Sequence, residues 1–355
     1  FFNQYIFLQV ATNSKNSSIM TITTIKDKIV VITGANTGIG LMTATRLATA
    51  SPKLVILACR NMEKCKAAIN EIKRSDGVPP DIDIQGLQLD LSSLDSVDKF
   101  AHELLALTNH IDVLVLNAGI LPLSSSVEYT NDGLERVFAV NHLGHFLLTL
   151  HLVEALERSK HTARVVVLSS MVHQYGILDF DDINYDQVKT VGQRQLYGRS
   201  KLANVLFAYE FHRLFSHLGI TCSAVHPGVV ASDILKDANC FIRHVGTLYM
   251  RLVGMNTTQG SDGSVYLAAS PEVEGVGALY LDKSTQAYSS DITYDAQVAQ
   301  KLWDVSLQLT NAKQRIPGYD IIIASKQNTN AAYPERPKNL KLQRSKFPIK
   351  VIIVT

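Results

Sequence analysis

The chain has 355 residues, a formal net charge of +2 at pH 7 and a hydrophobic fraction of 46%. This length can bury a large core, and the nearly balanced charge gives no reason to expect nucleic acid as a partner. The four cysteines have neither zinc-site spacing nor the density of a secreted disulfide scaffold, which favours reduced thiols in a cytoplasmic protein. No apolar run reaches the roughly 18 residues that a membrane-spanning helix needs.

Residues 1–25 are expected to form a disordered N-terminal extension outside the fold. They begin FFNQYIFLQV, an apolar stretch that is interrupted by Asn3, Gln4 and Gln9. No basic region precedes this stretch, so it makes a poor signal peptide. Met20 is followed directly by the segment that leads into the first predicted strand.

From residue 26 to residue 311, short apolar runs alternate with longer helical patterns. The runs that predict strands are 28–33, 54–59, 82–89, 112–117, 164–169, 221–226 and 278–281. Several are apolar throughout, as expected for parallel strands covered on both faces. The alternation predicts a single α/β domain, a doubly wound, Rossmann-type parallel sheet of about seven strands with helices on both faces. Ser92 and Asp95 predict a capping box for the helix after the third strand.

Past residue 311 the alternation stops, and residues 312–355 are interpreted as a C-terminal basic tail. The stretch 336–350 carries six basic residues and no acidic one, and a short apolar VIIVT follows it. A solvated or disordered tail is the simpler interpretation. Weak contact with an anionic membrane surface, which would make the protein peripheral to a membrane, is the alternative.

A glycine-rich turn, TGANTGIG, follows the first predicted strand and opens into a helical pattern. Glycines let the backbone turn sharply and approach a pyrophosphate, which then lies at the positive N-terminus of the helix. A plain tight turn is the alternative. The candidate cofactor-binding residues in this motif are Gly34, Asn36, Thr37, Gly38, Ile39 and Gly40.

The end of the second predicted strand bears on the choice of cofactor. It reads Ala58-Cys59-Arg60 and offers no acid. A site that prefers NAD places a carboxylate there to bond the ribose 2′-hydroxyl, whereas an arginine suits the 2′-phosphate of NADP. Arg60 therefore predicts NADP, with a solvated surface arginine as the alternative.

Two Tyr-x-x-x-Lys pairs occur in the second half of the domain, Tyr185 with Lys189 and Tyr197 with Lys201. This spacing brings phenol and ammonium onto one face only where the segment is helical. The first pair lies in a polar stretch that meets Gly192, whereas the second begins a long apolar-periodic helix. We therefore select Tyr197 and Lys201 as the candidate catalytic pair.

Three further polar residues lie among apolar neighbours. Asn141 interrupts an apolar helical run, where an amide is costly unless it is hydrogen-bonded. His142 and His145 are expected to pack or cap rather than to bind metal, because no third ligand accompanies them. No metal site is predicted.

These motifs, in this order, resemble the short-chain dehydrogenase/reductase family. The stretches VNHLGHF, YGRSKLAN, HPGVV and QGSDGSVYLAASPEVEGVGALYL are most similar to its retinol dehydrogenase and WW-domain oxidoreductase branch, without WW domains. The resemblance runs from about residue 26 to residue 309. It is specific for the fold and the chemistry, but not for the substrate.

The resemblance implies catalytic roles for four residues. Tyr197 exchanges a proton with the substrate oxygen, and Ser170, at the end of the fifth strand, holds that oxygen. Lys201 binds the nicotinamide ribose and, as a nearby cation, favours the phenolate form of Tyr197. Asn141 holds a helix irregularity and a water that relays protons to the lysine. The 27 positions between Ser170 and Tyr197 exceed the spacing of compact members.

Further cofactor-binding residues follow from the same resemblance. They are Asp90 at the adenine, Asn117, Ala118 and Gly119 in a variant of the family's NNAG element, and Pro227, Gly228 and Ser232 on the nicotinamide side, besides Tyr197 and Lys201. Leu116 replaces the first Asn of that element, and Ser232 stands where Thr is usual.

The predicted function is that of an NADP(H)-dependent oxidoreductase that moves a hydride between nicotinamide and a carbonyl or alcohol. An apolar loop, residues 234–256, suggests a hydrophobic substrate such as a retinoid, steroid, aldehyde or ketone. A catalytically inactive dinucleotide-binding regulator or scaffold on the same fold is the alternative. Phe207, Phe211 and Phe215 form a second apolar stripe, which predicts either a homodimer or burial under the C-terminal segment.

Overall fold

A single sheet organises the molecule. The computed structural model describes residues 25–228 and 256–337, and in these ranges eight strands run in the order β3-β2-β1-β4-β5-β6-β7-β8. Neighbouring strands are parallel except for the antiparallel pair β7–β8. The strands are β1 (Ile29–Thr33), β2 (Leu54–Cys59), β3 (Ile84–Gln88), β4 (Val113–Leu116), β5 (Ala163–Leu168), β6 (Ile220–His226), β7 (Tyr280–Asp282) and β8 (Thr285–Gln286). The predicted doubly wound sheet is confirmed, with β8 added at its edge.

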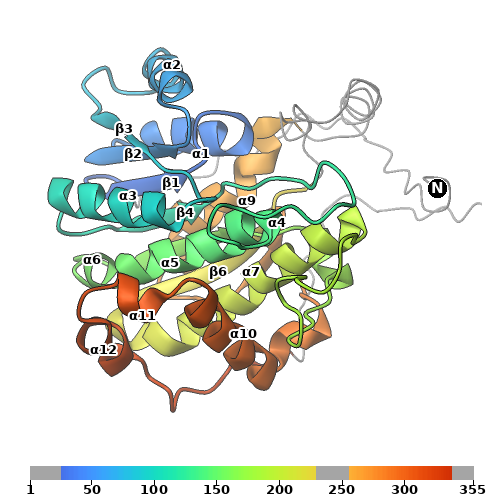
Figure 1. Cartoon of the computed structure of the whole chain (residues 1–355). Coiled ribbons are helices and arrows are strands. Elements are labelled where there is room, and N and C mark those ends of the chain that lie inside the picture. The colour runs from blue at the N-terminus through green and yellow to red at the C-terminus, as the bar shows by residue number, and fades with distance from the viewer. Residues whose placement is uncertain (1–24, 229–255, 338–355) are drawn as a thin grey trace, which may run out of the picture.

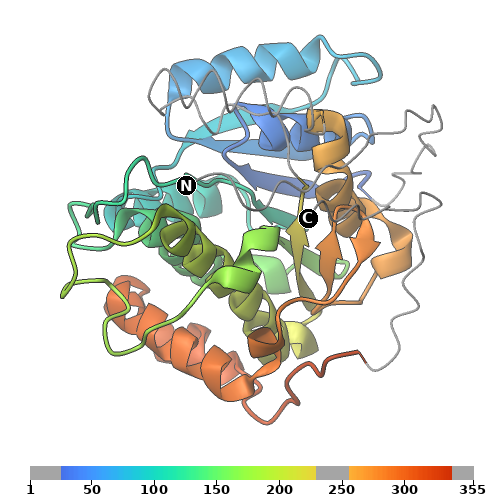
Figure 2. The same ribbon diagram turned by 90° about the vertical axis from the view of Figure 1, so that its right-hand side faces the viewer.

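Helices cover both faces of the sheet (Figure 1 and Figure 2). One face carries α1 (Gly38–Ala48), α2 (Met62–Lys73) and α9 (Thr257–Ala269). The other carries α3 (Leu94–Leu107), α5 (Gly144–His151), α6 (Val153–Glu157), α7 (Gln193–Phe215) and α10 (Ala296–Leu309). The core accordingly has two layers: Val30 and Ile32 of β1 enter one, and Ile29 and Val31 enter the other. This alternation explains why the strand is apolar throughout.

Short elements connect or extend these layers. They are α4 (Arg136–Phe138), the π-helical turn η1 (Ala139–Leu143), the 3₁₀ turns η2 (Met171–Tyr175), η3 (Ser216–Leu218), η5 (Pro271–Val273), η6 (Asp291–Tyr294) and η7 (Ala324–Lys326), and the helices α11 (Ala312–Arg315) and α12 (Tyr319–Ile322). Within the described part of the chain, no helix is long and apolar enough to cross a membrane.

Helix α3 begins one residue later than the predicted capping box places it. Its N-cap is Ser93, whose hydroxyl accepts a hydrogen bond from the backbone N–H of Ser96 at 3.3 Å. Ser92 instead donates its hydroxyl to Asp90 at 2.6 Å. Two adjacent hydroxyl residues both offer a helix start, and the carboxylate of Asp90 engages the first of them.

The folded chain continues past residue 311, where the sequence predicts a tail. Ile316, Tyr319 and Ile323 are at most 5% exposed and belong to the main core. Arg213 of α7 also donates to the carbonyl oxygen of Thr329 at 2.9 Å. Helices of four residues are too short for a periodic pattern to reveal them. At the other end Ile25 is fully buried, whereas residues 1–24 and 338–355 lie outside the described ranges.

The second apolar stripe of α7 is covered within the chain. Phe207, Phe211 and Phe215 are at most 3% exposed, and each ring centroid lies between 6.2 and 6.5 Å from that of Trp303 on α10. The sequence left two alternatives for this stripe, a homodimer or burial under a later segment of the chain. The structure shows burial within the chain. The stripe therefore no longer supports the prediction of a homodimer.

Candidate active site

The turn between β1 and α1 is tight and glycine-dependent. Gly34 and Gly38 have φ values of 63° and 59°, in the left-handed region that favours glycine. A methyl group at Gly40 would lie 2.5 Å from the carbonyl oxygen of Gly34. The side-chain amide of Asn117, just after β4, donates to the carbonyl oxygen of Thr33 at 2.8 Å and closes the turn. The N-terminus of α1 therefore stands at the carboxyl edge of the sheet, where a pyrophosphate can bind.

The remaining candidates for dinucleotide binding lie along the same edge. Asn36 and Thr37 are in the glycine turn, Ile39 is in the first turn of α1, and the N–H of Ala118 donates to the hydroxyl of Thr33 at 3.0 Å. Pro227 and Gly228 follow β6, and Gly228 has a φ of 85°. Ser232 and the apolar loop, apart from its last residue, lie outside the described residues.

Arg60 comes directly after β2 and is exposed. The N–H of Gly34 donates to the carbonyl oxygen of Ala58 at 2.8 Å, so the end of β2 adjoins the glycine turn. Among residues 25–228 and 256–337, no carboxylate pairs with the guanidinium of Arg60. Asp90, after β3, is half-buried and accepts the N–H of Ser92 at 2.9 Å. Arg60 thus follows a strand end that adjoins the glycine turn, and its side chain is exposed.

Asn141 occupies the π-helical turn η1, and its buried amide is fully engaged. Its Oδ1 accepts the N–H of Ile120 at 2.8 Å, and its Nδ2 donates to the carbonyl oxygen of Ile120 at 3.0 Å and to the hydroxyl of Ser200 at 2.9 Å. The helix irregularity that the resemblance implies is present at this residue. The amide connects the chain after β4 to α7.

Tyr197 and Lys201 lie one turn apart on α7, with the ammonium nitrogen 5.5 Å from the centroid of the phenol ring. Lys201 is 3% exposed, and its Nζ donates to the carbonyl oxygen of Leu168 at the end of β5 at 3.1 Å. Ser170, two residues further along, has its side chain close enough to the Tyr197 phenol to lower the pKa of that group. A Cβ at Gly119 would lie 3.4 Å from the Lys201 ammonium, so the segment after β4 reaches the same point. The catalytic candidates therefore converge at the carboxyl end of β5.

Burial sets the charge of both groups. It lowers the pKa of the Lys201 ammonium to about 8, which leaves the lysine mostly protonated at pH 7. Burial also raises the pKa of the Tyr197 phenol, and the side chain of Ser170 offsets this only in part. The expectation that Lys201 brings the pKa of Tyr197 towards neutrality is not met in this structure, because desolvation disfavours the phenolate more. Tyr197 consequently carries its proton.

The other Tyr-x-x-x-Lys pair is not on a helix. Tyr185 has a φ of 57° and lies in the segment before α7, and Lys189 is exposed. The Tyr185 ring packs against the Arg199 guanidinium, whose carbon lies 4.0 Å from the ring centroid. The structure thus separates the two pairs in the way that helical periodicity predicts.

Two polar residues that the sequence analysis did not single out hold these candidates in place. The hydroxyl of Ser200, inside the YGRSK motif, donates to the carbonyl oxygen of Tyr197 at 2.7 Å. His173 Nε2 accepts the N–H of Ser290 at 3.0 Å, so its proton is on Nδ1, which donates to the carbonyl oxygen of Ser170 at 2.7 Å. In the sequence, only their positions point to this role: Ser200 lies inside the YGRSK motif, and His173 lies three residues after Ser170.

The two histidines beside Asn141 pack in the core. His142 Nε2 lies 2.9 Å from the hydroxyl of Ser306, and His145 Nε2 lies 2.9 Å from that of Thr33. Burial lowers the pKa of both imidazoles to about 3, so both are neutral. No group of side chains in the described ranges could hold a metal ion.

Comparison with known proteins agrees with this arrangement. Residues 28–182 match the short chain dehydrogenase family, and human retinol dehydrogenase 13 is 37% identical over 291 residues, which are 81% of this chain and 85% of that protein. The chain belongs to the short-chain dehydrogenase/reductase family. Its members are oxidoreductases that use nicotinamide cofactors.

Two further comparisons extend this result. The WW domain-containing oxidoreductase of Pongo abelii is 38% identical over 289 residues, which are 79% of this chain and 68% of that protein. A crystal structure of a protein from Mycobacterium paratuberculosis superposes with a TM-score of 0.63 at 30% identity, covering 82% of this chain and 96% of that one. The resemblance to the retinol dehydrogenase and WW-domain oxidoreductase branch is confirmed.

Proposed function

We propose that this short-chain dehydrogenase/reductase uses NADP(H) and acts on a carbonyl or alcohol group of a hydrophobic small molecule. The observation that carries the proposal is the convergence of Ser170, Tyr197 and Lys201 at the carboxyl end of β5. This is the edge at which doubly wound sheets bind ligands, and the glycine turn lies on it as well.

The residues at this edge divide the chemistry between them. A nicotinamide bound at this edge would supply the hydride that reduces the carbonyl carbon. Tyr197, which carries its proton, donates it to the carbonyl oxygen, and the Ser170 hydroxyl binds that oxygen. The Lys201 ammonium stabilises the negative charge left on the phenol. In oxidation, the same residues act in the reverse order.

Two features of the structure fit a nicotinamide dinucleotide, and the second of them favours NADP. The tight glycine turn brings the N-terminus of α1 to the edge of the sheet, where a pyrophosphate is stabilised by the helix dipole. Arg60 follows β2, whose end adjoins this turn, and its exposed guanidinium would form charge-assisted bonds to a 2′-phosphate.

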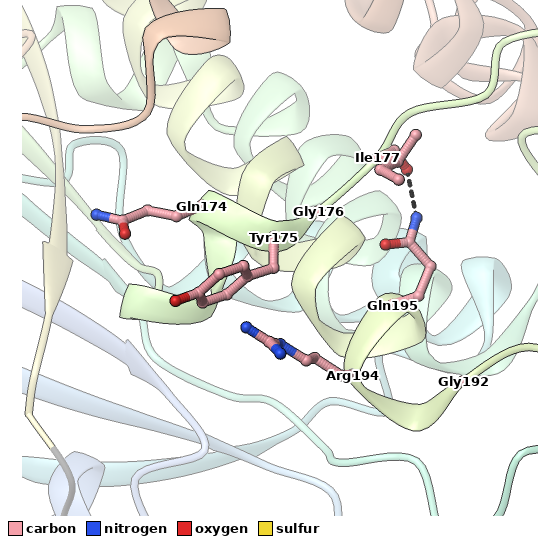
Figure 3. Close-up of a pocket in the computed structure, with 7 residues that line it drawn as sticks. All are labelled: Gln174, Tyr175, Gly176, Ile177, Gly192, Arg194 and Gln195. Carbon is pink, nitrogen blue, oxygen red and sulfur yellow. Dashed lines mark hydrogen bonds between the residues drawn. The ribbon is translucent and has the colours of Figure 1, made fainter. Parts of the chain in front are cut away.

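A hollow of about 490 Å³ beside η2, lined by both polar and apolar side chains, is a candidate substrate surface (Figure 3). Its lining includes Tyr175 and Ile177, which are 49% and 66% exposed, and the adjacent Met171 is 45% exposed. Arg194 lies across the Tyr175 ring, with 3.5 Å between the guanidinium carbon and the ring centroid. Because η2 begins directly after Ser170 in the chain, this exposed apolar surface is the candidate substrate side of the site.

A panel of substrates tests the proposal. Retinal, apolar aldehydes and steroid ketones would be incubated with NADPH or NADH, and turnover would be read from the loss of reduced-cofactor absorbance. We expect turnover with apolar carbonyls and a preference for NADPH. Cofactor binding without turnover of any substrate would instead favour the inactive regulator or scaffold.

A further inference from the structure

Arg199, two residues beyond Tyr197, is fully buried. Its side chain is 0% exposed, although arginine is almost never fully buried unless it is paired. Its Nη2 donates to the carboxylate of Glu135 at 2.6 Å, and its Nη1 donates to the carbonyl oxygen of Ile183. The guanidinium also packs against two aromatic rings, with its carbon 4.5 Å from the centroid of Phe138 and 4.0 Å from that of Tyr185.

Glu135 connects this arginine to the segment that carries Asn141. Besides pairing with Arg199, its carboxylate accepts the N–H groups of Val137 and Phe138 in α4, both at 2.8 Å, and caps that helix. Helix α4 continues directly into η1, which contains Asn141. Ser200, the neighbour of Arg199 on α7, accepts a hydrogen bond from Asn141. Adjacent residues of α7 therefore bind the N-cap of α4 and the middle residue of η1.

We propose that Arg199 is a positioning residue for the reaction. Through Glu135 it fixes the part of α7 between Tyr197 and Lys201 against η1. A shift at this point displaces the phenol and the ammonium together with respect to Asn141. The inference rests on the proposed function, since it concerns the alignment of the same catalytic groups.

The same guanidinium also holds the long segment between Ser170 and Tyr197. Ile183, whose carbonyl accepts from Arg199, belongs to this segment, and so does Tyr185, whose ring centroid lies 4.0 Å from the guanidinium carbon. The backbone of Tyr185 is held in turn by the hydroxyl of Tyr129, which donates to its carbonyl oxygen at 2.6 Å. The Tyr185 ring takes no part in the proposed acid–base chemistry. Its role is to pack against the Arg199 guanidinium.

An arginine is needed for these contacts because it is planar and carries several donors. It reaches a carboxylate, a backbone carbonyl and two ring faces at once, whereas a lysine offers one compact charge. Arg199→Lys therefore keeps a cation opposite Glu135 but loses the bond to Ile183 and the stacking on Tyr185. We expect kcat to fall by about 10- to 100-fold, as small misplacements of catalytic groups do. Two binding constants should stay within about threefold of the wild-type values: the Kd for NADPH, measured by the fluorescence of the bound cofactor, and KM for the carbonyl. The reason is that the substitution removes no contact with either ligand.

A matched control lies on the same helix. Arg213 pairs with Glu210 at 2.6 Å and is 11% exposed, near the far end of α7. Arg213→Lys should lower the melting temperature as Arg199→Lys does and leave kcat unchanged. A second pair of variants covers the case in which Arg199→Lys does not fold. Tyr185→Leu removes the stacked ring and should lower kcat, whereas Tyr185→Phe keeps the ring and should retain it.

If the wild-type protein is active, two results would overturn the proposal. One is wild-type kcat in Arg199→Lys or, if that variant does not fold, in Tyr185→Leu. The other is an equal loss of kcat in Arg199→Lys and Arg213→Lys, since that loss would reflect stability alone. Absence of turnover in the wild-type protein would overturn the proposed function and this inference together.

Discussion

At the scale of single residues, desolvation decides the protonation of the proposed acid–base pair. Tyr197 and Lys201 are held close together by one helical turn, yet burial acts on them in opposite directions along the pH scale. It raises the pKa of the phenol and lowers that of the ammonium, because in both cases the charged form is the costly one. At neutral pH the site therefore holds a neutral phenol beside a mostly charged lysine.

The lowered pKa of Lys201 predicts a basic limit to activity. The ammonium is lost as the pH rises through about 8, while Tyr197 keeps its proton because its pKa is raised. We expect kcat/KM for NADPH, which reports the free enzyme, to fall above pH of about 8. Lys201→Arg stays charged and should move this limit above pH of about 10. A basic limb at the same pH in both proteins would show that another group titrates.

Arg60 predicts the cofactor preference. Its charge-assisted bonds to a 2′-phosphate are worth about 1.5–3 kcal/mol, so Arg60→Ala should weaken NADPH binding by roughly 10- to 100-fold. NADH lacks the phosphate and should be unaffected. The measurement is the ratio of kcat/KM for NADPH over NADH. Arg74→Ala, at the far end of α2, removes the same charge as a control. An unchanged ratio in Arg60→Ala would mean that Arg60 faces only solvent.

At the scale of elements, the sheet could be predicted and the end of the fold could not. Runs such as 54–59 are apolar on both faces of their strand, so their pattern in the sequence is strong. Helices α11 and α12 have four residues each and are stabilised by tertiary contacts, which a periodic pattern does not show. The pairing of Arg199 with Glu135, 64 positions apart, is equally invisible in the sequence.

The C-terminal helices should contribute to stability like any other part of the core. Ile323 is fully buried and Ile321 is 78% exposed, so the two form a matched pair. Ile323→Ala should lower the free energy of unfolding by about 2–5 kcal/mol, and Ile321→Ala should change it by less than about 0.5 kcal/mol. Denaturant unfolding measures both. Equal, small effects would mean that residues beyond 311 are a tail after all.

At the scale of the whole molecule, the covered stripe on α7 bears on assembly. Phe211 is fully buried against Trp303 within one chain, so Phe211→Ala should destabilise the protein by about 3–5 kcal/mol. The melting temperature of the wild-type protein should not depend on its concentration through this surface, since no partner chain is needed to cover it. A melting temperature that rises with protein concentration in the wild type, but not in Phe211→Ala, would restore the homodimer as an explanation.

Removal of one oxygen atom from Tyr197 shows whether this residue is the proton donor of a hydride-transfer reaction. Tyr197→Phe should fold and bind NADPH as the wild type does, because the substitution keeps the ring on α7 and removes only the phenol oxygen. Its turnover should fall by at least the roughly 10²- to 10⁴-fold expected of a general acid, while Tyr185→Phe stays active. Wild-type turnover in Tyr197→Phe, or loss of turnover in Tyr185→Phe alone, would contradict the account.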